Sequence, residues 1–231
     1  MKILALESSA KAASVALCQD GALIAQYYQA SGLTHSRTLL KMAEDMLNNL
    51  DMTVSDVDGI AVCKGPGSFT GVRIGVAAAK GLAWGSGKPL CGVSTLEAMA
   101  YNCWDPAYTL CPVMDARRSE VYNALFEFDG DRLVRLTPDR AISLEDLAKE
   151  AKNCKKTLLL IGDGASLCYN YFLENNISSV LSAENVRLQS AYGVAMAARG
   201  GNFEDPALLE PNYLRLSQAE RERLAKAANQ K

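Results

Sequence analysis

The chain is poor in the residues from which catalytic and metal-binding sites are usually built. Its 231 residues include one histidine, His35. A site with two histidine ligands is therefore excluded, and a Ser-His-Asp triad would depend on this residue alone. We expect His35 to cap a helix or to lie in an interface. The seven cysteines form no C-x-x-C pair, which disfavours a zinc site and is typical of a reducing compartment.

Strong charge imbalance and long apolar runs are also missing. The formal net charge is −2, which disfavours a dominant phosphate-binding surface, because nucleic-acid affinity depends largely on Lys and Arg. We therefore expect any RNA to be contacted only through another protein. No stretch reaches 18 uninterrupted apolar residues, and no cleavable apolar leader is evident. The sequence predicts a cytoplasmic protein without a membrane segment.

A glycine-rich turn between a predicted strand and a predicted helix is the most distinctive stretch. Three glycines and a proline fall within residues 65–71, between a buried strand at 58–63 and a helix at 72–84. Such a turn can present backbone N–H groups to an anion, although the G-x-x-x-x-G-K-[ST] motif is absent. We take five residues of the turn as a candidate nucleotide or anion loop: Gly65, Gly67, Ser68, Thr70 and Gly71.

The helix after the turn is apolar or small on every side except at Arg73 and Lys80. A helix of this kind is normally buried. Four small residues recur every fourth position and share one face, where another helix can approach closely: Gly71, Gly75, Ala79 and Ala83. The neighbour is either internal or part of another chain, and we favour a docking surface.

The order of elements in the first half recurs in the second. Strands are predicted at 2–9, 13–18 and 23–29, followed by a helix at 34–50, the strand and helix around the turn, and a strand at 89–93. The second half has strands at 110–114, 121–128 and 132–136, a helix at 144–151 and a strand at 157–161. We predict two similar α/β domains facing each other across a cleft, at 1–105 and 106–214, and a polar helix at 215–231.

Carboxylates at two predicted strand ends are the remaining candidates for chemistry. Glu7 ends the first strand, and Asp115 and Glu120 flank the end of a later one, with Arg117 between them. Active-site groups often gather at strand ends. A structural ion pair or a loop-holding hydrogen bond explains these residues equally well, so we expect no catalytic residue.

Five blocks of sequence resemble the TsaB (YeaZ) family, the bacterial accessory proteins of threonylcarbamoyladenosine synthesis on tRNA. They span nearly the whole chain in the family's order: ILALESS at 3–9, GPGSFTGVRIG at 65–75, GVSTLEAM at 92–99, DARRSEVY at 115–122 and EPNYLR at 210–215. The resemblance implies two tandem ribonuclease-H-like domains of the actin-like, Hsp70-like ATPase superfamily. This agrees with the duplicated pattern.

The resemblance also implies a non-catalytic role beside TsaD, the family's catalytic paralogue. TsaD carries two metal-binding histidines four residues apart, and the corresponding positions here are Thr95 and Met99, neither of which replaces imidazole. No metal is therefore expected. By resemblance, the modified adenosine lies next to the anticodon of tRNAs that read codons beginning with A. The ATPase TsaE joins the pair, and TsaC supplies the threonylcarbamoyl-adenylate.

By resemblance, pairing with TsaD uses the two helices of the first domain. The predicted interface residues are His35, Leu39, Leu40, Ala43, Met46, Leu47, Val72, Gly75, Val76, Ala79, Lys80 and Ala83. The same helices can pair two copies of this chain when TsaD is lacking. No cofactor is predicted, and a nucleotide at the subunit interface stays open.

Two other functions remain as alternatives. One is a metallopeptidase-like (glycoprotease) hydrolase, a label once given to this superfamily, whose ligands this sequence lacks. The other is an ATP-binding kinase of the same fold, for which Glu7 and the turn at residues 162–164 would be the acidic residue and the second phosphate loop.

Overall fold

Alternating apolar residues at the start of the chain build the first of two sheets. The computed structural model describes residues 1–215, so the predicted polar helix lies, from residue 216 on, outside the described residues. The first sheet has the order β3-β2-β1-β4-β5. Its strands are β1 (Lys2–Glu7), β2 (Ala13–Gln19), β3 (Ala22–Gln29), β4 (Gly59–Cys63) and β5 (Leu90–Val93). The strands predicted at 2–9, 13–18 and 23–29 correspond to β1, β2 and β3, which pair as an antiparallel meander.

Two long helices cover one face of this sheet, and the two faces are distinguished by residue size. Helices α1 (His35–Asn48) and α2 (Phe69–Ser86) pack on Leu4, Leu6 and other large side chains. The opposite face carries smaller residues such as Ala5 and Ala61, against which α7 (Ala191–Ala198) packs. Because successive side chains of a strand point to opposite faces of the sheet, each strand contributes side chains to both cores.

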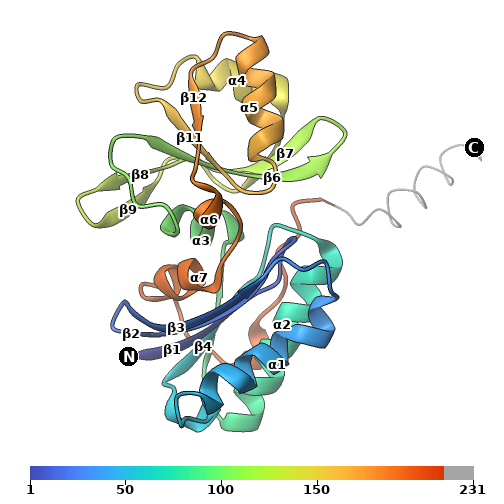
Figure 1. The fold of residues 1–231 in the computed structure, drawn as a ribbon, viewed down its shortest axis with the longest axis vertical. Coiled ribbons are helices and arrows are strands. Elements are labelled where there is room, and N and C mark those ends of the chain that lie inside the picture. Colours follow the sequence, from blue (N-terminus) through green and yellow to red (C-terminus); the bar gives the residue numbers. More distant parts are fainter. Residues whose placement is uncertain (216–231) are drawn as a thin grey trace, which may run out of the picture.

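The second sheet repeats this plan above the first (Figure 1). Its main path, β10-β7-β6-β11-β12, matches the first sheet strand for strand, which confirms the predicted duplication. The strands are β6 (Thr109–Arg117), β7 (Glu120–Asn123), β8 (Phe126–Asp129), β9 (Arg132–Arg135), β10 (Arg140–Ser143), β11 (Leu158–Ile161) and β12 (Ser179–Leu181). The helices are α4 (Leu144–Ala151), α5 (Ala165–Glu174) and α6 (Glu184–Arg187), and α3 (Thr95–Tyr101) lies between the two sheets.

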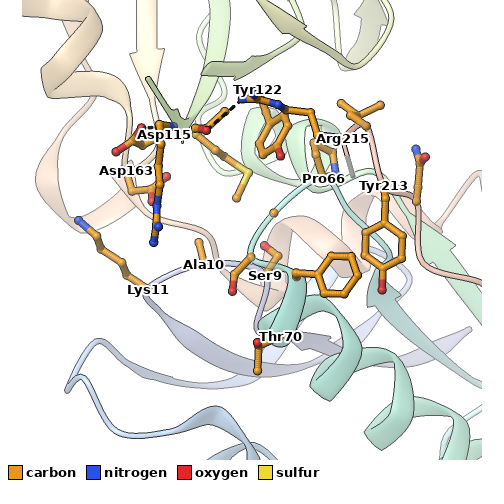
Figure 2. A pocket seen from close by; sticks show the side chains of 18 residues that line it. Ser9, Ala10, Lys11, Pro66, Thr70, Asp115, Tyr122, Asp163, Tyr213 and Arg215 are labelled. Carbon is orange, nitrogen blue, oxygen red and sulfur yellow. Dashed lines mark hydrogen bonds between the residues drawn. The ribbon is translucent and has the colours of Figure 1, made fainter. Parts of the chain in front are cut away.

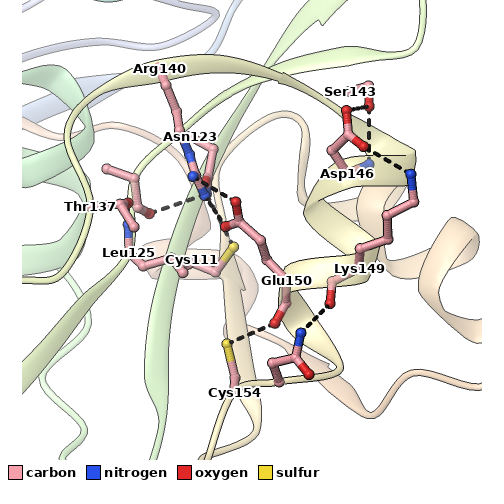
Figure 3. A network of polar contacts seen from close by, with 12 residues as sticks. Cys111, Asn123, Leu125, Thr137, Arg140, Ser143, Asp146, Lys149, Glu150 and Cys154 are labelled. Carbon is pink, nitrogen blue, oxygen red and sulfur yellow. Dashed lines mark hydrogen bonds and ion pairs between the residues drawn. The ribbon is translucent and has the colours of Figure 1, made fainter.

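The strand predicted at 121–128 is wrong, because the chain divides it into β7 and β8. The break follows Asn123, which is fully buried and whose Nδ2 donates to the carbonyl oxygens of Pro112 and Ala124. Its Oδ1 accepts from Arg140, which also pairs with Glu150 of α4 (Figure 3). This network holds the unpredicted strand β10 against β7.

The predicted second domain, 106–214, is too long at its end. We call the β1–β5 sheet with its helices the first lobe and the β6–β12 sheet with its helices the second lobe. Helix α7 packs on the first sheet, and Glu204 forms an antiparallel bridge to Leu90 of β5. The short 3₁₀ turn Pro206–Leu208 also lies against α2. The chain therefore returns to the first lobe before it ends, and the reason is that Ala198 and its neighbours complete that lobe's core.

None of the helices within residues 1–215 is both long and apolar enough to cross a membrane.

Candidate functional site

A cleft of about 560 Å³ lies between the two lobes and is the candidate site (Figure 2). Six segments line it: the loop after β1, the turn before α2 with the first residues of that helix, the end of β6, strand β7, the loop after β11 and the last described residues of the chain. The lining residues are Ser9, Ala10, Lys11, Pro66, Gly67, Ser68, Phe69, Thr70, Met114, Asp115, Ala116, Arg117, Tyr122, Asp163, Asn212, Tyr213, Leu214 and Arg215.

The end of β1 forms the floor beneath the cleft. Glu7 is fully buried, and its Oε1 accepts hydrogen bonds from the backbone N–H of Ser9, at 2.5 Å, and from the Ser9 hydroxyl. Burial raises the pKa of the Glu7 carboxyl, although hydrogen bonds from Cys63 and Ser9 oppose that rise. The carboxyl fixes the loop that follows the strand and does not line the cleft.

The glycine turn is locked onto this loop. The Ser68 N–H donates to the Ser9 carbonyl at 2.7 Å, and the Ser8 hydroxyl donates to the Gly71 carbonyl at 2.9 Å. A side-chain carbon at Gly67 would lie 2.4 Å from the Ser9 carbonyl oxygen. Glycine is thus required at this position by the close approach of two backbones.

One backbone N–H group of the turn forms a hydrogen bond within the turn. Ser68 is the N-cap of α2, and its hydroxyl accepts from the Gly71 N–H at 3.3 Å. Of the predicted anion loop, Gly67, Ser68 and Thr70 line the cleft, whereas Gly65 approaches the Asn212 carbonyl oxygen instead. Anion or nucleotide binding by this loop stays a prediction.

The second lobe contributes two carboxylates to the opposite wall. Asp115 ends the regular part of β6 and accepts from the Arg117 N–H at 2.7 Å. Asp163 follows β11, and its pKa is raised above the ordinary value, chiefly by burial. The charge of nearby Lys11 opposes this rise, and the charge of Asp115 adds to it. The sequence singled out Asp115 and Arg117 at this strand end, and Tyr122 ends the block at 115–122, whereas Lys11 carried no pattern that would have identified it.

The last described residues close one edge of the cleft, a feature that the sequence did not predict. Tyr213 stacks on Phe69 with ring centroids 4.3 Å apart, and Arg73 donates to the Tyr213 hydroxyl at 2.9 Å. Arg215 reaches the second lobe, where it pairs with Glu120 at 2.5 Å. The run EPNYLR at 210–215 was the signal that could have identified this segment.

The remaining candidates for chemistry lie outside the cleft. His35 begins α1, and its Nε2 donates to the Ala10 carbonyl at 2.7 Å, so it ties the β1 loop to this helix. Thr95 and Met99 are fully buried, and Met99 lies in the core of the second lobe. Within residues 1–215, no three His, Cys, Asp or Glu side chains gather as metal ligands.

The predicted docking face requires a correction. Gly71, Gly75, Ala79 and Ala83 face the inside of their own lobe, so the internal alternative is correct for these four positions. The sequence could not decide this, because α2 is apolar on nearly every side. In all, the chain's own core buries nine of the twelve predicted interface residues: Leu39, Ala43, Met46, Leu47, Val72, Gly75, Val76, Ala79 and Ala83. Lys80 and His35 are half-buried, and Leu40 is exposed.

The opposite face of α2 is also made of small residues and is open. Ala77, Gly81 and Gly85 are exposed, and a side-chain carbon at Gly81 or Gly85 would meet nothing within 4 Å. Leu40 of α1 and Trp84 of α2 are 47% and 62% exposed. We call these five residues the α1–α2 outer face.

Two lobes of matching strand order around a cleft define the actin-like ATPase fold, in which each lobe is ribonuclease-H-like. A family described as TsaD, tRNA N6-adenosine threonylcarbamoyltransferase, matches residues 29–221. The chain is 33% identical to the tRNA threonylcarbamoyladenosine biosynthesis protein TsaB of Bacillus subtilis over 95% of this chain and 96% of that one. The chain belongs to the TsaB family.

Two further comparisons agree with this assignment. The TsaB protein of Escherichia coli is 40% identical over 56% of each chain. A solved structure of YeaZ from Pseudomonas aeruginosa superposes with a TM-score of 0.76 at 27% identity, over 92% of this chain and 99% of the other. The resemblance predicted from the five sequence blocks is confirmed, as is the fold.

Proposed function

We propose that this chain is a non-catalytic subunit of the machinery that makes threonylcarbamoyladenosine on tRNA, and that it binds and supports a TsaD-type catalytic protein. Its family membership gives the pathway. The observation that carries the subunit role is the α1–α2 outer face, which leaves apolar and small side chains exposed on two adjacent helices. Such a face is typical of a helix-packing interface.

The outer face offers moderate rather than extreme affinity. Burying Leu40 and Trp84 contributes roughly 1.5–3 kcal/mol for each side chain. Association costs on the order of 4–15 kcal/mol, so the partner must add contacts of its own. The exposed Ala77, Gly81 and Gly85 let a partner's helix approach closely, as small residues do wherever two helices pack tightly.

The rest of the proposal follows from the family. TsaE joins the pair as its ATPase, tRNA is held by the complex rather than by this chain, and the work takes place in the cytoplasm, where tRNA is modified. The net charge of −2 supports an indirect contact with tRNA.

Reconstitution tests the requirement for this chain. TsaD, TsaE and TsaC are incubated with tRNA, threonine, bicarbonate and ATP, with and without this protein, and modified adenosine is measured by mass spectrometry. We expect modification to fall at least tenfold when this chain is omitted. Equal modification in its absence would refute the accessory role.

Substitutions on the outer face test the docking surface. Gly81→Arg and Ala77→Arg place a long charged side chain where the partner's helix is expected, and both positions are exposed, so the isolated chain stays folded. Co-elution with TsaD should be lost. Leu173→Arg changes a 65% exposed residue of α5 in the second lobe; it is the matched control and should co-elute normally. Retained co-elution of both outer-face variants would exclude this surface.

A further inference from the structure

The segment 204–215, which we call the strap, connects the far edge of the first lobe to the second lobe. It starts at β5, where Glu204 and Leu90 exchange two backbone hydrogen bonds of 3.0 Å. Leu209 then enters the first lobe's core and is 2% exposed. The strap is therefore anchored firmly at its beginning, and its last residues lie along the cleft.

Two residues hold the strap to the first lobe beside the cleft. The Asn212 N–H donates to the Lys64 carbonyl at 2.6 Å. Tyr213 stacks on Phe69 with an interplanar angle of 25°, and the Arg73 guanidinium lies 3.9 Å above the Phe69 ring. The strap thus rests on the first turn of α2.

The contact with the second lobe is made by Arg215, two residues further on. Its guanidinium donates to the Ala116 carbonyl at 3.1 Å and pairs with Glu120 at 2.5 Å. Both partners belong to the β6–β7 hairpin, where three successive residues, Arg117 to Ser119, have positive φ angles of 57–65°. The side chains of Arg215 and Glu120 are 20% and 37% exposed. Arg215 is therefore mostly covered and the Glu120 oxygen that it pairs with is buried, so solvent screens this ion pair only in part.

A much more extensive contact between the lobes is made by α3. Leu96 and Met99 lie in the core of the second lobe, while Ala98 lies in the core that the first sheet forms with α7. The Ser94 hydroxyl donates to Asp139 at 2.6 Å, and Arg135 pairs with Glu97 at 2.8 Å. Figure 1 shows α3 between the lobes, well to the left of the point where the described chain ends.

We propose that the strap is a latch that sets how far the cleft opens. The lobes turn about α3, whose side chains are built into both cores, and Arg215 holds the cleft edge closed through Glu120 and Ala116. Releasing Arg215 leaves the hinge and the anchor at Leu209 intact. The lobes can then separate at the cleft, and Asp115, Asp163 and Lys11 become more accessible.

A distance measurement between the lobes tests the latch in the full chain. Spin labels are attached at Asn48→Cys on α1 and Glu174→Cys on α5, both exposed positions, with Cys154→Ser removing the half-buried native thiol. Pulsed electron paramagnetic resonance then gives the distance distribution. We expect one dominant population in the parent protein. In Arg215→Ala, the share of a second population at a different distance should be at least threefold higher than in the parent.

Three further variants separate a latch from a general loss of stability. Glu120→Gln breaks the same ion pair from the second lobe and should produce the same second population, also if Arg215→Ala folds poorly. The exchange Arg215→Glu with Glu120→Arg should suppress it again. Arg132→Ala removes an exposed arginine of β9 and should leave the distribution unchanged. An unchanged distribution in both Arg215→Ala and Glu120→Gln would overturn the proposal.

Discussion

A side-chain carbon at Gly71 would lie 2.2 Å from the carbonyl oxygen of Ser8. This approach joins the first turn of α2 to the loop after β1, and the obstructing atom belongs to the backbone, which cannot move aside cheaply. Glycine is therefore required at position 71, where α2 packs against the loop that forms the floor of the cleft.

Alanine at two glycines of the same helix should have opposite effects. Gly71→Ala should lower the free energy of unfolding by about 2–4 kcal/mol, as overpacking and a displaced backbone do. Gly81→Ala should raise it by roughly 0.5–1 kcal/mol, because alanine favours the helix and meets nothing within 4 Å. Urea unfolding measures both. Equal stabilities of the two variants would contradict the close approach at Gly71.

Alanine substitutions at two neighbouring leucines of the strap should lower stability to very different extents. Leu209 is 2% exposed and Leu208 is 68% exposed. Leu209→Ala should cost about 2–5 kcal/mol of stability through lost burial and a cavity. Leu208→Ala should stay within about 0.5 kcal/mol of the parent. Thermal unfolding of the pair checks whether the strap is part of the first lobe's core.

The pKa of Glu7 predicts a pH dependence of stability. Burial raises this pKa in the folded chain, so the folded state retains the proton at pH values where the unfolded chain has released it. The stabilising contribution is complete below the unfolded value and is lost as the pH rises through the folded value. Glu7→Gln cannot ionise and should be more stable than the parent at pH 8.

The Glu7→Gln difference should disappear at low pH. Melting temperatures of both proteins are compared from pH 4 to pH 8, and a gain of about 2–4 °C is expected for each kcal/mol at the upper end. Ser9→Ala is a useful companion, because it removes the hydroxyl that donates to Glu7. A difference in melting temperature that grows as the pH falls would contradict a raised pKa of the buried Glu7 carboxyl.

The Asn123 network should be costly to disrupt. Asn123→Leu leaves the carbonyl oxygens of Pro112 and Ala124 without this donor and removes an acceptor from Arg140. Each buried group left unsatisfied costs about 1–3 kcal/mol. Asn153→Leu, at an exposed position whose Nδ2 donates to the Lys149 carbonyl, is the control and should be nearly neutral. A comparable loss of stability in both variants would contradict a stabilising role for the Asn123 network, which Figure 3 shows.

The duplicated fold could be predicted because each half repeats the same strand and turn signals. The strands predicted at 13–18 and 23–29 form an antiparallel hairpin, and the glycine turn joins β4 to α2 as predicted. The hairpin of β8 and β9 agrees with the strands predicted to end at 128 and to span 132–136. The division of the strand 121–128 into β7 and β8 could not be foreseen, because the break after Asn123 depends on hydrogen bonds to Pro112 and Arg140 on other strands.

The orientation of α2 was beyond the sequence for a different reason. Residues 71, 75, 79 and 83 form one small-residue row, and residues 77, 81 and 85 form another. Composition does not tell which row meets the sheet; the position of Ser8 beside Gly71 and Gly75 does. The cleft was likewise predicted as a consequence of duplication, but its edge at Tyr213 and Arg215 required the path of the whole chain.

Helix α7 has a consequence for how the protein folds as it is made. Its residues 191–198 supply much of one side of the first lobe's core, and Gly193 lies so close to α3 that a side-chain carbon there would be 1.9 Å from the Ala98 carbonyl oxygen. A ribosome releases the first sheet long before this helix. The usual sequence, in which the N-terminal unit folds first, therefore does not apply here: the second lobe has all its strands available earlier, and the first lobe closes its core last.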